Sequence, residues 1–213
     1  MRKKITLSTF GSIVCAVNVI IILIQFLFGV FINNTIAMDS AGIYTILNYL
    51  ISVVFYIIVA TSFSRGKDNF FFNYRALLIL IISDYVFPFV YNLLIGSINF
   101  ITTGPTAIIS SLISSLGLAL GIVYFIFLIL ETKNRKKSYG ITLFVFGIIM
   151  MCFALIDLGF TLYSLISSFI ALTSYTPLVI FAFIVNIVAS FVSCGFSVIY
   201  FLYAKELKEI RGY

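Results

Sequence analysis

The sequence predicts an all-α fold: a polytopic integral membrane protein built as a six-transmembrane-helix up-down bundle, with its N and C termini in the cytoplasm. Hydrophobic residues make up 62% of the 213 residues and charged residues only 9%, whereas soluble proteins contain roughly 45–50% apolar and about 25% charged residues. The apolar residues form long runs separated by short polar connectors, and basic residues occur in only some of these connectors. We therefore expect residues 1–213 to form a single transmembrane domain.

Six apolar runs are long enough to cross a bilayer as helices, which takes about 20 residues each. All connectors between them are short, so consecutive helices are expected to lie antiparallel as three hairpins. The expected spans are 8–32, 43–63, 76–97, 106–130, 141–171 and 178–203. The first run follows a basic start, as in a signal peptide, but no convincing small-x-small cleavage site follows it, so we expect an uncleaved first helix.

The positions of the basic residues set the expected orientation. All 13 Lys and Arg residues lie at the two termini or in the connectors 64–75 and 131–140, and the other three connectors carry none. Connectors rich in Lys and Arg stay in the cytoplasm. Both termini are therefore expected on the cytoplasmic side of the cell membrane, and spans 76–97 and 141–171 run outward in parallel.

Polar residues recur at helical spacing on the first, second and sixth spans, and most of them are assigned to helix packing because small and polar side chains support close helix contacts. Such stripes would also allow a polar cavity between the helices. The stripes include Asn18, Tyr56, Asn186, Ser190 and Ser197.

The connector 64–75 mixes aromatic and charged residues from Phe70 to Tyr74. An aromatic belt at the level of the lipid headgroups is the favoured interpretation. The alternative is a docking surface for a membrane or cytoplasmic protein partner.

Asp84, in the third span, is the leading candidate functional residue. A charge in hydrocarbon costs about 2.5–3.5 kcal/mol, so it needs a partner or a purpose. Pro88 follows four residues later, and because proline has no N–H, the Asp84 carbonyl would lose its helical donor and the helix would kink. Tyr91 and Asn92 extend roughly the same face. We expect this face to bind a substrate or an ion, as broken helices do in transporters.

The fourth span carries small residues on one face, which predicts close helix–helix packing. The same face is the second candidate surface for a protein partner. It consists of Ser110, Ser114, Gly117 and Gly121.

Asp157 lies near the middle of the fifth span, with Thr161 one turn later. Because the third and fifth spans run in the same direction, Asp157 and Asp84 are expected at similar depth. No Lys, Arg or His occurs in any span. The acids could therefore be protonated and hydrogen-bonded to a neighbouring helix, bound to a cation or cationic solute, or exposed to water. Two carboxyl groups sharing one proton would also balance the charge.

Other functional classes are excluded. The net charge of +6 is explained by the cytoplasmic clusters, so no nucleic-acid partner is expected. Without His, the chain cannot form a Ser-His or Cys-His nucleophile or a His-bearing zinc site, and it has no Gly-rich phosphate loop. We expect no enzyme activity, no cofactor and no metal site. The lipid bilayer is the partner that the composition itself implies.

Two functional hypotheses follow. The first is a small-solute or cation carrier, or the membrane subunit of a transport complex, that uses the mid-membrane aspartates. In size, six spans and cytoplasmic termini the chain resembles the substrate-binding subunits of energy-coupling-factor vitamin transporters. It lacks the Ala-x-x-x-Ala docking pattern expected in their first span, because Ala16 is followed four places later by Ile20. No family is assigned. The alternative is a non-transporting scaffold, assembly or immunity-type protein that acts through helix–helix contacts. The short loops and richness in Ile, Phe and Asn favour a bacterial source.

Overall fold

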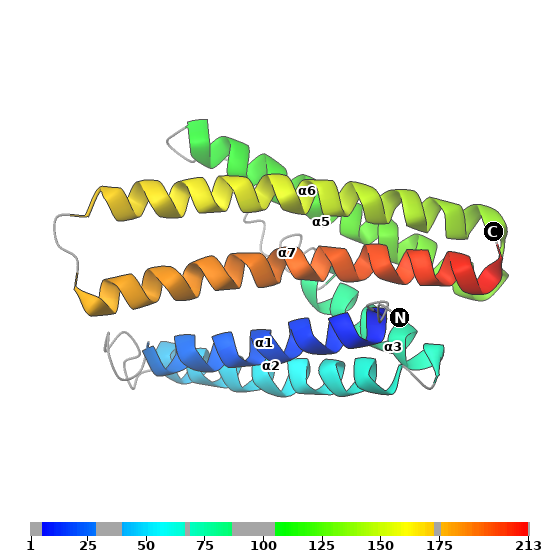
Figure 1. The fold of residues 1–213 in the computed structure, drawn as a ribbon, viewed down its shortest axis with the longest axis horizontal. Helices are drawn as coiled ribbons and strands as arrows, with labels where there is room; N and C mark the ends of the chain where they lie inside the picture. Colours follow the sequence, from blue (N-terminus) through cyan, green and yellow to red (C-terminus); the bar gives the residue numbers. More distant parts are fainter. Residues whose placement is uncertain (1–5, 29–39, 67–68, 87–104, 173–175, 213) are drawn as a thin grey trace, which may run out of the picture.

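The described part of the chain consists of helices joined by short non-helical segments (Figure 1). The computed structural model describes residues 6–28, 40–66, 69–86, 105–172 and 176–212, without the side chains of 40–45 and 105–114. The elements are α1 (Leu7–Leu27), α2 (Ser40–Arg65), α3 (Phe70–Ile81), the π-helical turn η2 (Ile82–Val86), α5 (Pro105–Asn134), α6 (Lys137–Ile170) and α7 (Pro177–Arg211).

Five of these helices, α1, α2, α5, α6 and α7, are long and apolar enough to cross a membrane. Their outer surfaces expose large apolar side chains such as Ile51 (66%) and Ile170 (70%), as contact with lipid requires. The chain is therefore a multi-pass helical membrane protein. At 1.5 Å per residue α6 and α7 are each about 50 Å long, so they extend beyond a hydrocarbon core of about 30 Å. The six-span count and the sidedness of the termini stay predictions.

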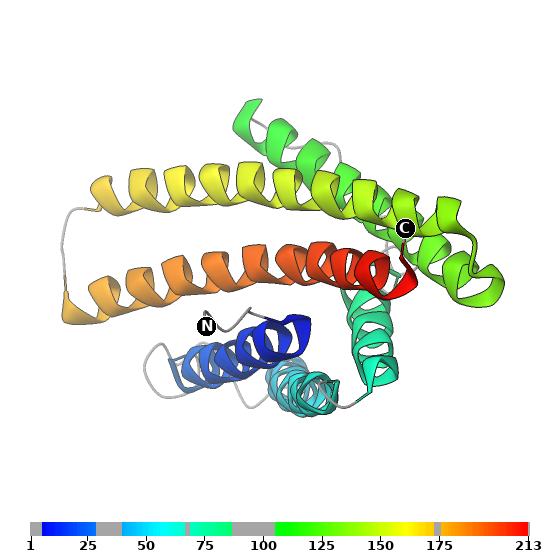
Figure 2. The ribbon, with the colours of Figure 1, turned by 45° about the vertical axis from the view of Figure 1, so that its right-hand side comes forward.

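Neighbouring helices pack as antiparallel hairpins, and the hairpins contact one another. α1 lies against α2, α6 against α7, and α5 against α6, while α1 also contacts α7. The short α3 packs against α2, α5 and α7, and Figure 2 shows it set across the ends of the longer helices. Close approach depends on small residues. A Cβ on Gly147 of α6 would lie 3.1 Å from the Phe201 Cα of α7, so glycine lets these two backbones touch.

The helix ends that carry basic residues gather at one end of the bundle, which we call the basic end. It comprises the start of α6 and the ends of α2, α5 and α7, at the right of Figure 1, and the start of α1, which itself carries no basic residue, lies at the same end. The Leu7 N–H donates a hydrogen bond to Glu206 Oε1 at 2.7 Å. Arg211 Nε lies 3.2 Å from Glu131 Oε1. Polar contacts between distant helices thus close this end.

The hydrophobic core lies next to the basic end, where α3 fills the space between the long helices. Its fully buried side chains come from all six α-helices that the structure describes. They include Leu7, Phe63, Leu77, Leu80, Tyr124, Leu128, Leu143, Ile199 and Tyr200. Farther along the helices the interior is less filled, and this is where the site described below is found.

The predicted connector 64–75 is wrong at its second half, because α3 already begins at Phe70. Asn69 starts the helix: its side-chain oxygen accepts a hydrogen bond from the Phe71 N–H at 2.9 Å. The segment from Phe70 to Tyr74 is therefore helical and is not a loop. Phe70 stacks on Tyr203 of α7 with ring centroids 5.2 Å apart, whereas the Phe71 side chain is 60% exposed.

The predicted connector 131–140 is also too long. α5 continues to Asn134 and α6 starts at Lys137, with Arg135 between them at φ 50°. Polar residues can stay helical here because α7 also continues, to Arg211, and supplies an ion-pair partner for the buried Glu131. A helix ends where its capping and packing end, which need not be where its apolar run ends.

Candidate functional site

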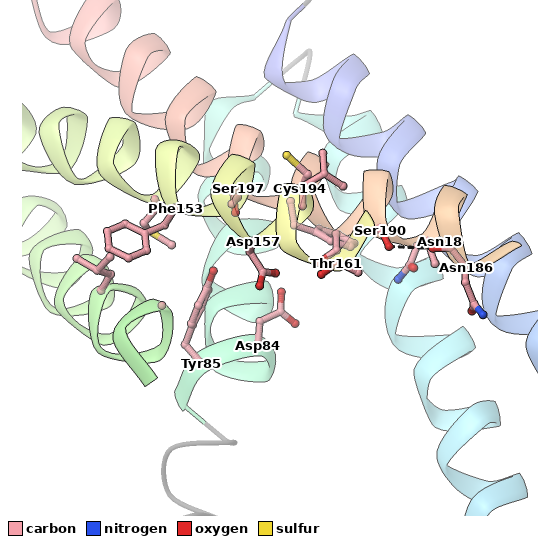
Figure 3. Close-up of a pocket in the computed structure, with 18 of the residues that line it drawn as sticks. Asn18, Asp84, Tyr85, Phe153, Asp157, Thr161, Asn186, Ser190, Cys194 and Ser197 are labelled. Carbon is pink, nitrogen blue, oxygen red and sulfur yellow. Dashed lines mark hydrogen bonds between the residues drawn. The ribbon is translucent and has the colours of Figure 1, made fainter. Parts of the chain in front are cut away.

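A cavity of about 680 Å³ lies among the helices, farther along them than the core beside the basic end. Figure 3 shows this cavity in close-up. Its walls come from α1, α2, η2, α5, α6 and α7. Its polar lining residues include Asn18, Tyr56, Asp84, Tyr85, Asp157, Thr161, Asn186, Ser190, Ser193 and Ser197. Leu120, Met150, Phe153, Leu158 and Phe196 supply apolar parts of the same wall.

Asp84 stands between this cavity and a group of buried tyrosines. Its Oδ2 accepts a hydrogen bond from the Tyr200 hydroxyl at 3.4 Å, a distance at the long limit for such a bond. Tyr200 is fully buried, and its carbonyl accepts a hydrogen bond from the buried Tyr124 hydroxyl at 2.8 Å. Figure 3 shows the Asp84 carboxyl group directed into the cavity. The tyrosines therefore support the carboxyl group from the side of the basic end.

The backbone leaves α-helical geometry where it carries Asp84. α3 ends at Ile81, and residues 82–86 form the π-helical turn η2. A π-helical turn rotates the following side chains relative to the α-helix before it, and such turns occur frequently at functional sites. Pro88, two residues beyond this turn in the sequence, has no N–H to donate to the Asp84 carbonyl.

Tyr85 is fixed by packing against α5. A Cβ on Gly121 would lie only 2.1 Å from the Tyr85 ring, so a larger residue could not occupy position 121 with Tyr85 in this place. The Tyr85 ring also meets Tyr200 edge-on, with centroids 5.8 Å apart. Gly121 thus positions Tyr85 on the cavity wall.

Asp157 and Thr161 reach the same cavity from α6. Figure 3 shows the Asp157 and Asp84 carboxyl groups directed toward the same part of the cavity from opposite walls. Within the described residues, Asp157 is exposed and Asp84 partly exposed. None of the described lining residues is Lys or Arg. The fold thus unites Asp84, Asp157 and Thr161 around an open space that has no basic side chain among its described walls.

The other predicted site residues fall into two groups. Pro88, Tyr91 and Asn92 lie outside the described residues. On the small-residue face of α5, the side chains of Ser110 and Ser114 are likewise not described, whereas Gly117 lines the cavity and Gly121 packs on Tyr85.

Apart from Tyr56, the sequence did not single out the aromatic residues of the site. Tyr85, Tyr124 and Tyr200 form its support, and Phe153 lines its wall. Their sequence signal is weak, because an aromatic residue in an apolar span is equally typical of core packing or of lipid contact. Tyr85, directly after Asp84, offered the best clue.

No protein-family model, curated protein or solved structure matches this chain. The fold and site define a class: a multi-pass helical membrane protein with a polar cavity of small-molecule size. Within the described residues, no three His, Cys, Asp or Glu side chains group as metal ligands would.

Proposed function

We propose that this protein is a small-solute or cation carrier, or the membrane subunit of a transport complex, and that its cavity is the solute site. The observation that carries the proposal is the convergence of Asp84 and Asp157 on one cavity from η2 and α6. The cavity of about 680 Å³ falls within the range of roughly 300–1,000 Å³ typical of small-molecule sites.

The exposure of the two acids supports this function over simple helix packing. A protonated Asp that only joins two helices would be enclosed between them. Here Asp157 is exposed and Asp84 is partly exposed, and both line an open space. An intramembrane acid that faces a cavity is typical of a solute or ion pathway.

The core is filled with side chains beside the basic end, which favours entry of the solute from the opposite end of the bundle. Buried Tyr124 and Tyr200 separate the cavity from the basic end. We call Tyr124 and Tyr200 the tyrosine layer. A carrier would have to open this layer to release solute at the basic end, whereas a binding subunit could rely on a partner to open it.

The second candidate function is a scaffold or assembly protein. The exposed Phe71 ring at the start of α3, which lies 6.3 Å from the Tyr74 ring between centroids, favours it. The Phe70 ring already stacks on Tyr203, so a partner would contact mainly the Phe71 ring. The α5 face is a weaker partner surface, because Gly117 and Gly121 face the cavity and Tyr85.

Filling the cavity tests the proposed function. No described heavy atom lies within 4 Å of a Cβ built on Gly117, so the ring in Gly117→Phe should occupy the cavity. Gly159 of α6 is equally uncrowded, is exposed, and is not among the lining residues, which makes Gly159→Phe the matched control. The readout is mass analysis of small molecules extracted with each purified protein in lipid nanodiscs.

We expect wild type and Gly159→Phe to retain a small molecule and Gly117→Phe to lose it. A wild-type protein that carries no small molecule, or equal retention by Gly117→Phe, would contradict a solute site. If a protein co-purifies, and its recovery falls with Phe71→Ala while Gly117→Phe has no effect, the scaffold function is supported.

A further inference from the structure

We propose that the cavity takes an organic cation, an amine with an apolar or aromatic body, whose ammonium group lies between Asp84 and Asp157. This inference rests on the proposed function and specifies the ligand. It follows from the charge, the size and the aromatic lining of the cavity.

The acidic residues of the cavity favour a ligand of positive charge. Asp84 and Asp157 are its acidic lining residues, and its described wall contains no Lys or Arg. All 13 basic residues of the chain lie at the termini or in the two basic stretches near residues 64–75 and 131–140. Two carboxylates facing one space repel each other and an anionic ligand, whereas a cation between them relieves that repulsion.

The size and chemistry of the wall favour an organic cation over a bare metal ion. Ca²⁺ takes 6–8 oxygen ligands at about 2.3–2.6 Å, which calls for a small, oxygen-lined site. This cavity is about 680 Å³, and apolar groups of Leu120, Met150 and Leu158 share its wall with the acids. Such a wall suits the carbon skeleton of a ligand.

Aromatic rings complete the match to an amine. Tyr56, Tyr85, Phe153 and Phe196 line the cavity, and Figure 3 shows the Tyr85 side chain beside Asp84. Ammonium groups are attracted to aromatic faces within about 6 Å of the ring centroid. Carboxylate and aromatic groups side by side therefore provide both an ion pair and a cation–π surface.

Three probes that share a phenyl ring and have similar length test how binding depends on the charge of the ligand. They are 2-phenylethylamine, which is protonated at neutral pH, 2-phenylethanol, which is neutral, and phenylacetate, which is anionic. Binding of each probe to the purified full-length protein in nanodiscs is measured by calorimetry, and NaCl is titrated in the same way as the control for an inorganic cation.

The variants are Asp84→Asn and Asp157→Asn, each of which removes one carboxylate, and Asp157→Glu, which keeps a carboxylate at position 157. Glu209→Gln removes an exposed acid near the end of α7 and serves as the control.

We expect the amine to bind and the alcohol and phenylacetate to bind at least about tenfold more weakly. Each Asp→Asn change should weaken amine binding by about tenfold or more, because it removes one of the two carboxylates that pair with the ammonium group. Asp157→Glu should recover most of that loss, and Glu209→Gln should change nothing. Equal or tighter binding of the alcohol or phenylacetate, or amine binding indifferent to both Asp→Asn changes, would overturn the proposal.

The two proposals fail in different ways. If a co-extracted molecule is lost in Gly117→Phe but proves neutral or anionic, and the amine does not bind, the solute site stands and its assignment to cations is wrong. If wild type carries no small molecule and binds none of the three probes, both proposals are wrong.

Discussion

Asp84 is held by two neighbours that act in different ways. The hydroxyl of Tyr200 donates to its carboxyl group at 3.4 Å, and the adjacent Tyr85 fixes the backbone turn by packing its ring on Gly121. The carboxyl group consequently has a hydrogen-bond donor behind it and an open cavity before it. At the residue scale, the site depends as much on the missing side chain at position 121 as on the acid.

Gly121→Leu should therefore destabilise the protein itself. A Cβ at this position would lie 2.1 Å from the Tyr85 ring, and overpacking of this kind costs about 1–3 kcal/mol. The midpoint of thermal unfolding in detergent should fall, while Gly159→Leu, at an uncrowded glycine, should leave it nearly unchanged. Adding Tyr85→Ala should restore part of the lost stability, because it removes the clash. An additive double variant would argue against this contact.

At the scale of the elements, the chain uses α7 to organise the starts and ends of other helices. Glu206 accepts a hydrogen bond from the Leu7 N–H at the start of α1, and Arg211 pairs with Glu131 near the end of α5. A carboxylate at a helix N-terminus also interacts favourably with the helix dipole. These contacts explain why α7 stays helical well beyond its apolar run.

Glu206→Ala should loosen the first turn of α1. Leu7 is fully buried, so its N–H would lose a charged acceptor, which costs about 1.5–3 kcal/mol. Hydrogen exchange measured by mass spectrometry should become faster in the first turn of α1 than elsewhere in that helix. Glu209→Ala, an exposed acid one turn from the same site, is the control. Equal protection of this turn in the two variants would refute the contact.

At the scale of the whole molecule, the bundle is asymmetric along its length. Basic residues, polar ties between helices and the filled core lie toward one end, and the cavity lies farther along the helices. The charge asymmetry predicts that the basic end is cytoplasmic. The cavity would then be reached from outside, and the tyrosine layer would be the barrier on the inner side.

Reporter fusions test this orientation. A reporter that is active only in the cytoplasm should be active after Tyr213, and one that is active only outside should be active when inserted at residues 172–177. Lys and Arg near the span ends determine this topology, so the reverse pattern of activities would show that the positive-inside assignment is wrong. The same fusions made within 98–105 would test whether the third span crosses the membrane.

Much of the site could be named from the sequence, because a carboxylate in an apolar run is conspicuous on its own. Asp84 and Asp157 were identifiable in this way, and Thr161 was identifiable because it lies one turn after Asp157. The structure places all three around one cavity. The packing of Gly121 on Tyr85 and the hydrogen bond from Tyr200 to Asp84 could not be predicted, because each contact joins two different elements. The lengths of the basic connectors were misjudged for two different reasons. Asn69 is a local cap that starts α3 inside the connector 64–75, and Arg211 keeps the end of α5 helical through a contact with a distant helix.

The sequence by itself determined that this protein lies in a lipid bilayer. Apolar runs of bilayer length and basic residues confined to a few stretches make it a multi-pass membrane protein, since hydropathy and charge are local properties that each segment carries alone. Only the tertiary structure decided that α1, α2, η2, α5, α6 and α7 line one cavity and that two acids share it. Which side chains meet is set by how helices distant in the sequence pack, and no single segment contains that information.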